Sequence, residues 1–126
     1  MRLTLILIAA ILLTSCSMGQ VLVRPGMPLI EKGIDDLNRE TDLKAAEKTI
    51  TGNLKILEGM IKLDPKNALL HTYAAQAYYA LAFGFNEDSR PQRASDLYLR
   101  GLQHGITALE LVGADNLRDS TIAEFN

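Results

Sequence analysis

The apolar residues of this chain recur with a helical period over most of its length. Between residues 42 and 64 the intervals are three or four residues, which predicts one long amphipathic helix. Thr41 or Asp42 can cap its start, and Pro65 ends it because the residue before a proline is displaced from the α region. The apolar stripe consists of Leu43, Ala46, Ile50, Leu54, Leu57 and Ile61.

A second helix is predicted from Asn67, a good capping residue, to about Phe83. Its broad apolar face contains Leu70, Tyr73, Ala74, Ala77, Tyr78 and Leu81. The short turn at residues 64–67 requires the first two helices to pack antiparallel.

A third strong helix is predicted from residue 89 to about Gly113. Ser89 and Gln92 have the spacing of a capping box, and Pro91 falls in the first turn, where its missing N–H does little harm. Its inner face contains Ala94, Leu97, Tyr98, Gly101, Gly105, Ala108, Leu109 and Val112. The two glycines of this face allow a neighbouring backbone to come close.

A shorter helix is predicted over residues 29–38, and no stretch alternates like a strand. We therefore predict an all-α fold built from antiparallel helical hairpins.

The start of the chain has the anatomy of a signal peptide. Arg2 is followed by an apolar run from Leu3 to Leu13, which is too short for a helix that must cross about 30 Å of hydrocarbon. The run closes with Leu-Thr-Ser and then Cys16, the only cysteine, which resembles the bacterial lipobox. In a lipobox the cysteine thiolate is the nucleophile that takes a diacylglycerol. The alternative is an ordinary secretory signal that leaves Cys16 as a free thiol.

We therefore expect three parts: a signal peptide over residues 1–15, a lipidated tether over residues 16–28, and a helical domain over residues 29–126. The tether contains glycine and proline without a helical period, and we expect it to be extended. Ser17 stands where many lipoproteins retained in the inner membrane carry aspartate, so the outer membrane is favoured.

Composition narrows the classes of function. The 13 basic and 15 acidic residues give a net charge of −2 without any block of like charge, so nucleic acid is not an expected partner. A single cysteine excludes an intramolecular disulfide, and with only His71 and His104 beside it a metal site is not expected. We expect no cofactor. No nucleophile elbow or phosphate loop is present, so an enzyme is disfavoured.

The hairpins resemble tetratricopeptide repeats. If Ala68 opens a repeat, Ala74, Ala75 and Tyr78 fall on its seventh, eighth and eleventh positions. Ala94, Tyr98 and Gly101 then keep the spacing of the second helix of a repeat. The longer link between Tyr78 and Ala94 indicates a tetratricopeptide-like fold and not a regular array.

Three stretches, residues 53–59, 83–88 and 93–101, together resemble the T component of tetratricopeptide-associated TRAP transporters, with Asn86 where an aliphatic residue is expected. The resemblance covers residues 42–111 and includes the lipoprotein start. It implies a trimeric lipoprotein that docks the periplasmic solute-binding P component of a tripartite ATP-independent periplasmic transporter. Members of that family are longer, so the resemblance implies a shortened or truncated member; another helix is expected after Ser120.

Charged and aromatic residues around the predicted start of the third helix are candidates for a partner or ligand surface: Tyr79, Phe83, Phe85, Glu87, Asp88, Arg90, Arg93 and Arg100. Charges at a helix start are usually helix caps, dipole partners and solvated ion pairs, and aromatic residues at helical spacing are usually core. Tyr79 lies off the apolar stripe and is the strongest exception. His71 and His104 are interpreted as surface or edge residues.

The favoured hypothesis is a membrane-anchored, non-catalytic lipoprotein that assists a TRAP transporter. Two rivals stay open: a scaffold of another envelope complex, and a carrier that holds an apolar small molecule between its helices.

Overall fold

The computed structural model describes residues 18–114, and this part of the chain is helical without strands. The predicted all-α class is confirmed. The signal segment, Cys16 and the helix expected after Ser120 lie outside the described residues. The elements are α2 (Met18–Val23), a 3-10 turn η2 (Arg24–Gly26), α3 (Met27–Leu37), α4 (Leu43–Leu63), α5 (Ala68–Phe85) and α6 (Pro91–Leu111).

The hairpin of α4 and α5 forms as its caps and stripe predict. The Asp42 carboxylate accepts hydrogen bonds from the backbone N–H groups of Lys44 and Ala45, at 2.9 and 3.2 Å. The Asn67 side chain accepts one from the N–H of Leu70 at 3.3 Å. Leu43 departs from the predicted stripe: it is 71% exposed, because the first residue of α4 precedes the part of that helix that faces α5.

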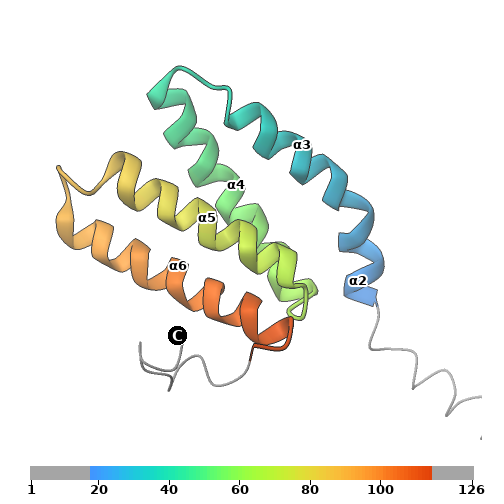
Figure 1. The fold of residues 1–126 in the computed structure, drawn as a ribbon. Coiled ribbons are helices and arrows are strands. Elements are labelled where there is room, and N and C mark those ends of the chain that lie inside the picture. Colours follow the sequence, from blue (N-terminus) through green and yellow to red (C-terminus); the bar gives the residue numbers. More distant parts are fainter. Residues whose placement is uncertain (1–17, 115–126) are drawn as a thin grey trace, which may run out of the picture.

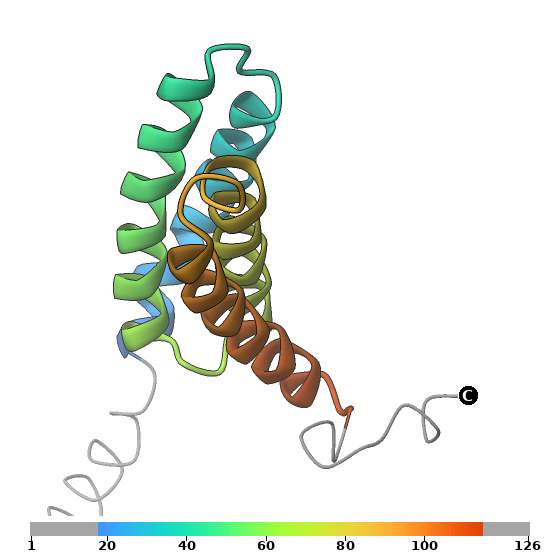
Figure 2. The ribbon, with the colours of Figure 1, turned by 90° about the vertical axis from the view of Figure 1, so that its left-hand side faces the viewer.

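Helix α5 is apolar around most of its circumference, so it has to be covered on more than one side. Figures 1 and 2 show α5 between α4 and α6, with α3 beside α4. The central core consists of Ile50, Leu54, Ala74, Tyr78 and Leu81. A second cluster joins Val23, Leu57 and Leu70, and it ties α2 to this hairpin.

Helices α5 and α6 approach closely at Gly101, as the small residues of α6 predict. A Cβ atom at this position would lie 3.3 Å from both the Ala75 carbonyl oxygen and the Tyr78 Cβ. The same construction at Gly105 gives a looser 4.0 Å to the Ala75 Cβ. Gly101 is therefore the contact that sets the distance between the two helices.

The expected capping box of α6 is wrong. The helix begins after Arg90, and no side chain caps it. The turn before it is closed instead by the Arg90 N–H, which donates to the Asn86 carbonyl oxygen at 2.8 Å. This turn moves the helix start one residue along the chain and leaves Ser89 outside it, whereas Pro91 does fall in the first turn.

The extended tether expected up to residue 28 is also wrong in its described part. Residues 18–26 form α2 and η2, and α3 already begins at Met27. Val23 is 1% exposed and packs against Leu57 and Leu70, and a Cβ at Gly19 would overlap the Leu63 carbonyl. Local composition favoured a loop, but packing against α4 stabilises helix, and the prolines at the starts of η2 and α3 are compatible with it.

The hairpins give the described domain two distinct ends. We call the end with α2 and the α4–α5 turn the proximal end, and the end with the α3–α4 and α5–α6 connections the distal end (Figure 1). No helix among residues 18–114 combines the length and the apolar character needed to cross a membrane.

Two glycine substitutions test the importance of the α5–α6 contact. Gly101→Val should lower the free energy of unfolding by about 1–3 kcal/mol, because its side chain has no room against α5. The control is Gly52→Ala on α4, where nothing lies within 4 Å, and we expect it to stabilise by about 0.5–1 kcal/mol. Urea unfolding followed by circular dichroism measures both; equal effects would contradict the close contact.

Candidate functional site

An exposed aromatic cluster lies on the outer side of α5 and α6. The rings of Tyr79 and Phe83 stack with centroids 5.7 Å apart, and Tyr98 of α6 tilts toward Tyr79 at 5.9 Å. Tyr79 and Phe83 are 56% and 61% exposed, so they do not belong to the core. Residues four apart on a helix share a face, which explains the pairing of the first two rings.

The aromatic cluster continues onto α6 as a surface hollow with a volume of about 480 Å³. Exposed Leu99 and Leu102 lie in its lining beside Tyr98, and Glu87 borders it. Burial and the adjacent carboxylate of Glu87, which accepts a hydrogen bond from Tyr98, raise the pKa of the Tyr98 hydroxyl. Tyr98, Leu99 and Leu102 were not among the predicted surface residues, although the latter two lie off the inner stripe of α6.

The predicted charged residues separate into two groups. Arg90 is held by the structure: it pairs with Glu47 of α4 at 3.3 Å and donates to the Phe85 carbonyl oxygen at 3.4 Å. Arg100 likewise donates to the Tyr78 hydroxyl at 3.3 Å. Glu87 and Asp88 are exposed in the α5–α6 turn, and Glu87 borders the hollow beside Tyr98. Arg93 is exposed on another side of α6, next to Lys44 and Lys48 of α4. Phe85 is half-buried against the core and contributes less surface than predicted.

Asn86 organises the α5–α6 turn next to this surface. It is 2% exposed, and its side-chain Nδ2 donates to the Leu81 carbonyl oxygen at 2.6 Å. Its Oδ1 is buried without a hydrogen-bond partner. The sequence marked Asn86 only as a departure from an aliphatic position, and the structure explains the amide by its hydrogen bond to the end of α5.

A polar network crosses the interior from α4 to α6. The Tyr78 hydroxyl donates to the Glu58 carboxylate and accepts from Arg100, and the His104 ring stacks on the Tyr78 ring with centroids 5.7 Å apart. The Nδ1 atoms of His71 and His104 lie 2.9 Å apart. Burial and the Glu58 carboxylate raise the pKa of Tyr78, against a lowering effect of Arg100.

The surface or edge interpretation is therefore wrong for His71, whereas His104 is half-buried at the edge of α6. His71 is 7% exposed, and His104 packs directly against it. The reason is visible in retrospect: His71 lies three residues before Ala74 and seven before Tyr78, so it shares the inner face of α5. A sequence pattern cannot pair residues of two helices without knowing how these helices pack.

The Pro65 carbonyl oxygen determines which ring nitrogens of His71 and His104 donate hydrogen bonds and which accept them. The Pro65 carbonyl oxygen can only accept, so the Nε2 of His71, 3.1 Å away, carries a hydrogen. In the neutral pair the Nδ1 of His71 then accepts from the Nδ1–H of His104. Burial, followed by His71 and Arg100, lowers the pKa of His104, against an opposing effect of Glu58. Among residues 18–114, no three His, Cys, Asp or Glu side chains gather closely enough to hold a metal ion.

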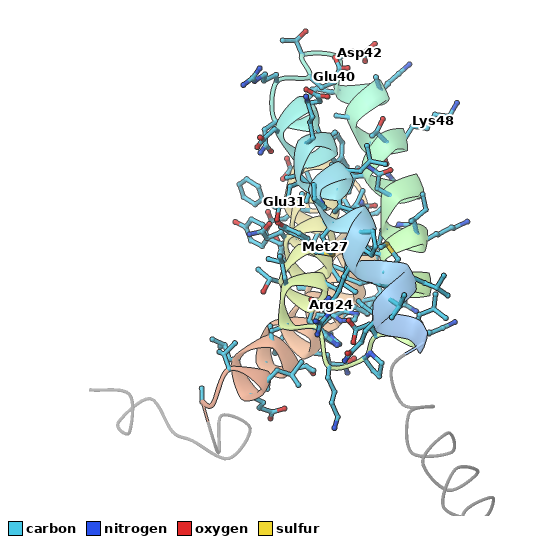
Figure 3. The ribbon with its side chains drawn as sticks, turned by 90° about the vertical axis from the view of Figure 1, so that its right-hand side faces the viewer. Arg24, Met27, Glu31, Glu40, Asp42 and Lys48 are labelled. Carbon is cyan, nitrogen blue, oxygen red and sulfur yellow. The ribbon has the colours of Figure 1, made fainter. Side chains whose placement is uncertain are left out.

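A groove of about 420 Å³ lies where α3, α4 and α5 meet. Its lining is mainly apolar, with Ile34 and Leu37 from α3, Ile50 from α4 and Ala77 from α5. Tyr73 borders it, and burial together with the Glu31 carboxylate, which accepts a hydrogen bond from Tyr73, raises the pKa of that tyrosine. Figure 3 shows Glu31 on α3.

Replacing Asn86 by Asp should destabilise the protein by about 2 kcal/mol or more, because the carboxylate cannot donate to the Leu81 carbonyl and brings charge into a buried site. Ser89→Ala is the control. Since Ser89 does not cap α6, this substitution should change the free energy of unfolding by no more than about 0.5 kcal/mol. Loss of a true helix cap would cost about 1 kcal/mol. Urea unfolding measures both, and an unchanged Asn86→Asp midpoint would refute the role of the amide.

The histidine pair should make stability depend on pH. The folded pKa of His104 lies below its ordinary 6.5, so the unfolded chain binds more protons as the pH falls below about 6.5. The contribution is complete above that pH and is lost as the pH falls toward the folded pKa. Urea unfolding between pH 7.5 and 5.5 should show this loss, and His104→Gln should show a smaller one. Parallel curves for the two proteins would contradict it.

Comparison with protein-family models identifies a family for this chain. Residues 39–126 match the model of the family described as TRAP transporter T-component. The match begins before α4 and includes the α5–α6 hairpin with its aromatic cluster. Comparison with curated proteins and with solved structures gave no match. Because the family model covers most of its length, the chain belongs to the TRAP transporter T-component family.

Proposed function

We propose that this T-component protein is a non-catalytic lipoprotein, anchored by acylated Cys16, that docks the periplasmic solute-binding protein of a TRAP transporter. The membership of the family supports a part in TRAP transport within the cell envelope. The lipobox-like residues before Cys16 support the anchor. The docking surface is the aromatic cluster with its exposed charged neighbours.

The observation that carries the docking proposal is the exposed stack of Tyr79 and Phe83. Stacked rings with more than half of their surface in water are unusual in a monomer and typical of a binding surface. Tyrosine and other aromatic residues supply much of the binding energy at protein interfaces. Glu87 and Asp88 in the adjacent α5–α6 turn provide the polar rim that such interfaces have.

The position of the surface supports the same function. The α5–α6 turn, which carries Glu87 and Asp88, is at the distal end, whereas α2, the first described element after Cys16, is at the proximal end (Figure 1). A protein anchored at Cys16 would present this turn toward the periplasm. Family resemblance supports a homotrimer, and Ser17 supports the outer membrane.

A second candidate function is that of an apolar-ligand carrier, and one observation favours it. The groove between α3, α4 and α5, with about 420 Å³ and a mainly apolar lining, falls within the range of small-molecule sites. Native mass spectrometry of the delipidated protein tests it. A retained small molecule that is lost in Ala77→Trp, which fills the groove, would support the carrier.

Docking can be tested with two alanine substitutions of matched exposure. Phe83 on α5 and Ile56 on α4 are each 61% exposed. Phe83→Ala should weaken binding to the solute-binding protein by about tenfold or more, since an interface aromatic contributes about 2 kcal/mol. Ile56→Ala should leave the dissociation constant within about twofold. Biolayer interferometry with the immobilised solute-binding protein measures both.

Glu87→Lys provides a second variant on the same surface, because Glu87 borders the hollow next to Tyr98. It should slow association more than it speeds dissociation, because exposed charges act mainly through steering. Unchanged kinetics in both Phe83→Ala and Glu87→Lys, with wild-type binding intact, would place the docking site elsewhere.

A further inference from the structure

The proximal end combines exposed apolar side chains with basic ones. Val21 and Leu22 of α2 and Leu63 at the end of α4 are large apolar residues that are more than half exposed. Arg24, Lys62 and Lys66 are exposed beside them in sequence, on η2, the last turn of α4 and the α4–α5 turn. Together these six residues form the proximal patch.

Chain connectivity brings this patch close to Cys16. Only two residue steps separate Cys16 from Met18, and two steps span at most about 7 Å whatever their conformation. Helix α2 is not free to swing away, because Val23 is buried against Leu57 and the backbone at Gly19 lies directly on the Leu63 carbonyl. Acyl chains on Cys16 would therefore hold the proximal patch at the lipid surface.

The distribution of charge along the domain also favours contact of the proximal end with the membrane. Figure 3 shows Arg24 toward the proximal end and Glu40 and Asp42 at the distal end. The distal connections and their flanks carry Asp35, Asp36, Glu40, Asp42, Glu87 and Asp88. At the proximal end Asp64 is buried, and the other described acidic residue is Glu110 in the last turn of α6. The distal acidic residues outnumber the basic Arg39, Lys44 and Lys48 beside them, so anionic lipid would attract the proximal end more strongly than the distal end.

We propose that the proximal patch binds the surface of an anionic phospholipid membrane, with Val21, Leu22 and Leu63 in the interfacial layer and Arg24, Lys62 and Lys66 on the headgroup phosphates. This inference rests on the proposed acylation of Cys16. Apolar side chains that enter the interface and basic residues that meet anionic headgroups contribute independently to such binding. The contact fixes the orientation of the domain, so that the docking surface on α5 and α6 is held away from the lipid.

The test uses the lipidated protein in vesicles of equimolar phosphatidylglycerol and phosphatidylcholine. Acylation consumes the thiol of Cys16, so a cysteine introduced as Leu22→Cys or Glu40→Cys is the only one available to a fluorophore. Quenching by nitroxide-labelled lipid should be several-fold stronger at position 22 than at position 40. Equal quenching at the two positions, in protein whose acylation is verified by mass, would overturn the proposal and leave the anchor intact.

A matched pair of charge reversals isolates the basic residues. The first variant combines three substitutions in the proximal patch, Arg24→Glu, Lys62→Glu and Lys66→Glu. It should reduce the quenching at position 22 severalfold, and in vesicles of pure phosphatidylcholine the variant and the unchanged patch should give equal quenching. Arg39→Glu with Lys44→Glu and Lys48→Glu makes the same change in net charge at the distal end and should have no effect. Equal effects of both sets would overturn the assignment to the proximal patch.

Mass analysis that finds Cys16 unmodified would overturn the anchor alone. Flotation of the unlipidated protein with the same vesicles then tests whether the proximal patch binds the lipid surface by itself. A partition coefficient from flotation that falls about a hundredfold in the proximal triple variant supports the patch, since each of the three basic residues changes such binding about fivefold. Absence of flotation overturns it.

Discussion

The burial of α5 is the constraint on which the rest of the structure depends. A helix that is apolar around most of its circumference cannot be covered by one neighbour, so α4 and α6 pack on two of its sides. Gly101 lets α6 come close enough to exclude water from Tyr78, which is 2% exposed. Tyr79 and Phe83 lie on the part of α5 that neither neighbour covers, and this remainder is the proposed docking surface.

The same packing determines the polar interior. Once α6 lies on α5, Tyr78 and His71 are buried, and the half-buried His104 and the exposed Arg100 supply hydrogen-bond partners for them. The result couples three helices: Glu58 belongs to α4, His71 and Tyr78 to α5, and His104 to α6. Only one proton fits between the two facing Nδ1 atoms, so the network keeps its geometry while at least one ring is neutral.

The architecture separates two tasks along one short domain. Close contact of α2 with the end of α4 brings the lipid attachment proposed at Cys16 next to the folded body, without a long tether. The antiparallel hairpin of α5 and α6 then carries the α5–α6 turn to the opposite end. The proposed docking function needs rigidity more than chemistry, because such a protein would hold one partner at a defined distance and angle from the membrane.

The sequence by itself determined the helices that carry their own signals. The apolar stripe from Ala46 to Ile61, the caps Asp42 and Asn67, and Pro65 predicted the α4–α5 hairpin, because these signals act within one or two helical turns. The short stretches around Asn53, Phe83 and Arg93 also indicated the family. Tyr79 was predicted as a surface residue because it lies outside the apolar stripe, and Phe83 was one of the candidates beside it.

Only the tertiary structure decided the pairing of His71 with His104, the role of Asn86 and the helical state of residues 18–26. Each depends on a contact between segments far apart in the chain. Val23 is helical because Leu57 and Leu70 bury it, and His104 packs against His71 because Gly101 brings α6 onto α5. Local periodicity records which face of a helix is apolar, but the partner of that face is chosen by packing in three dimensions.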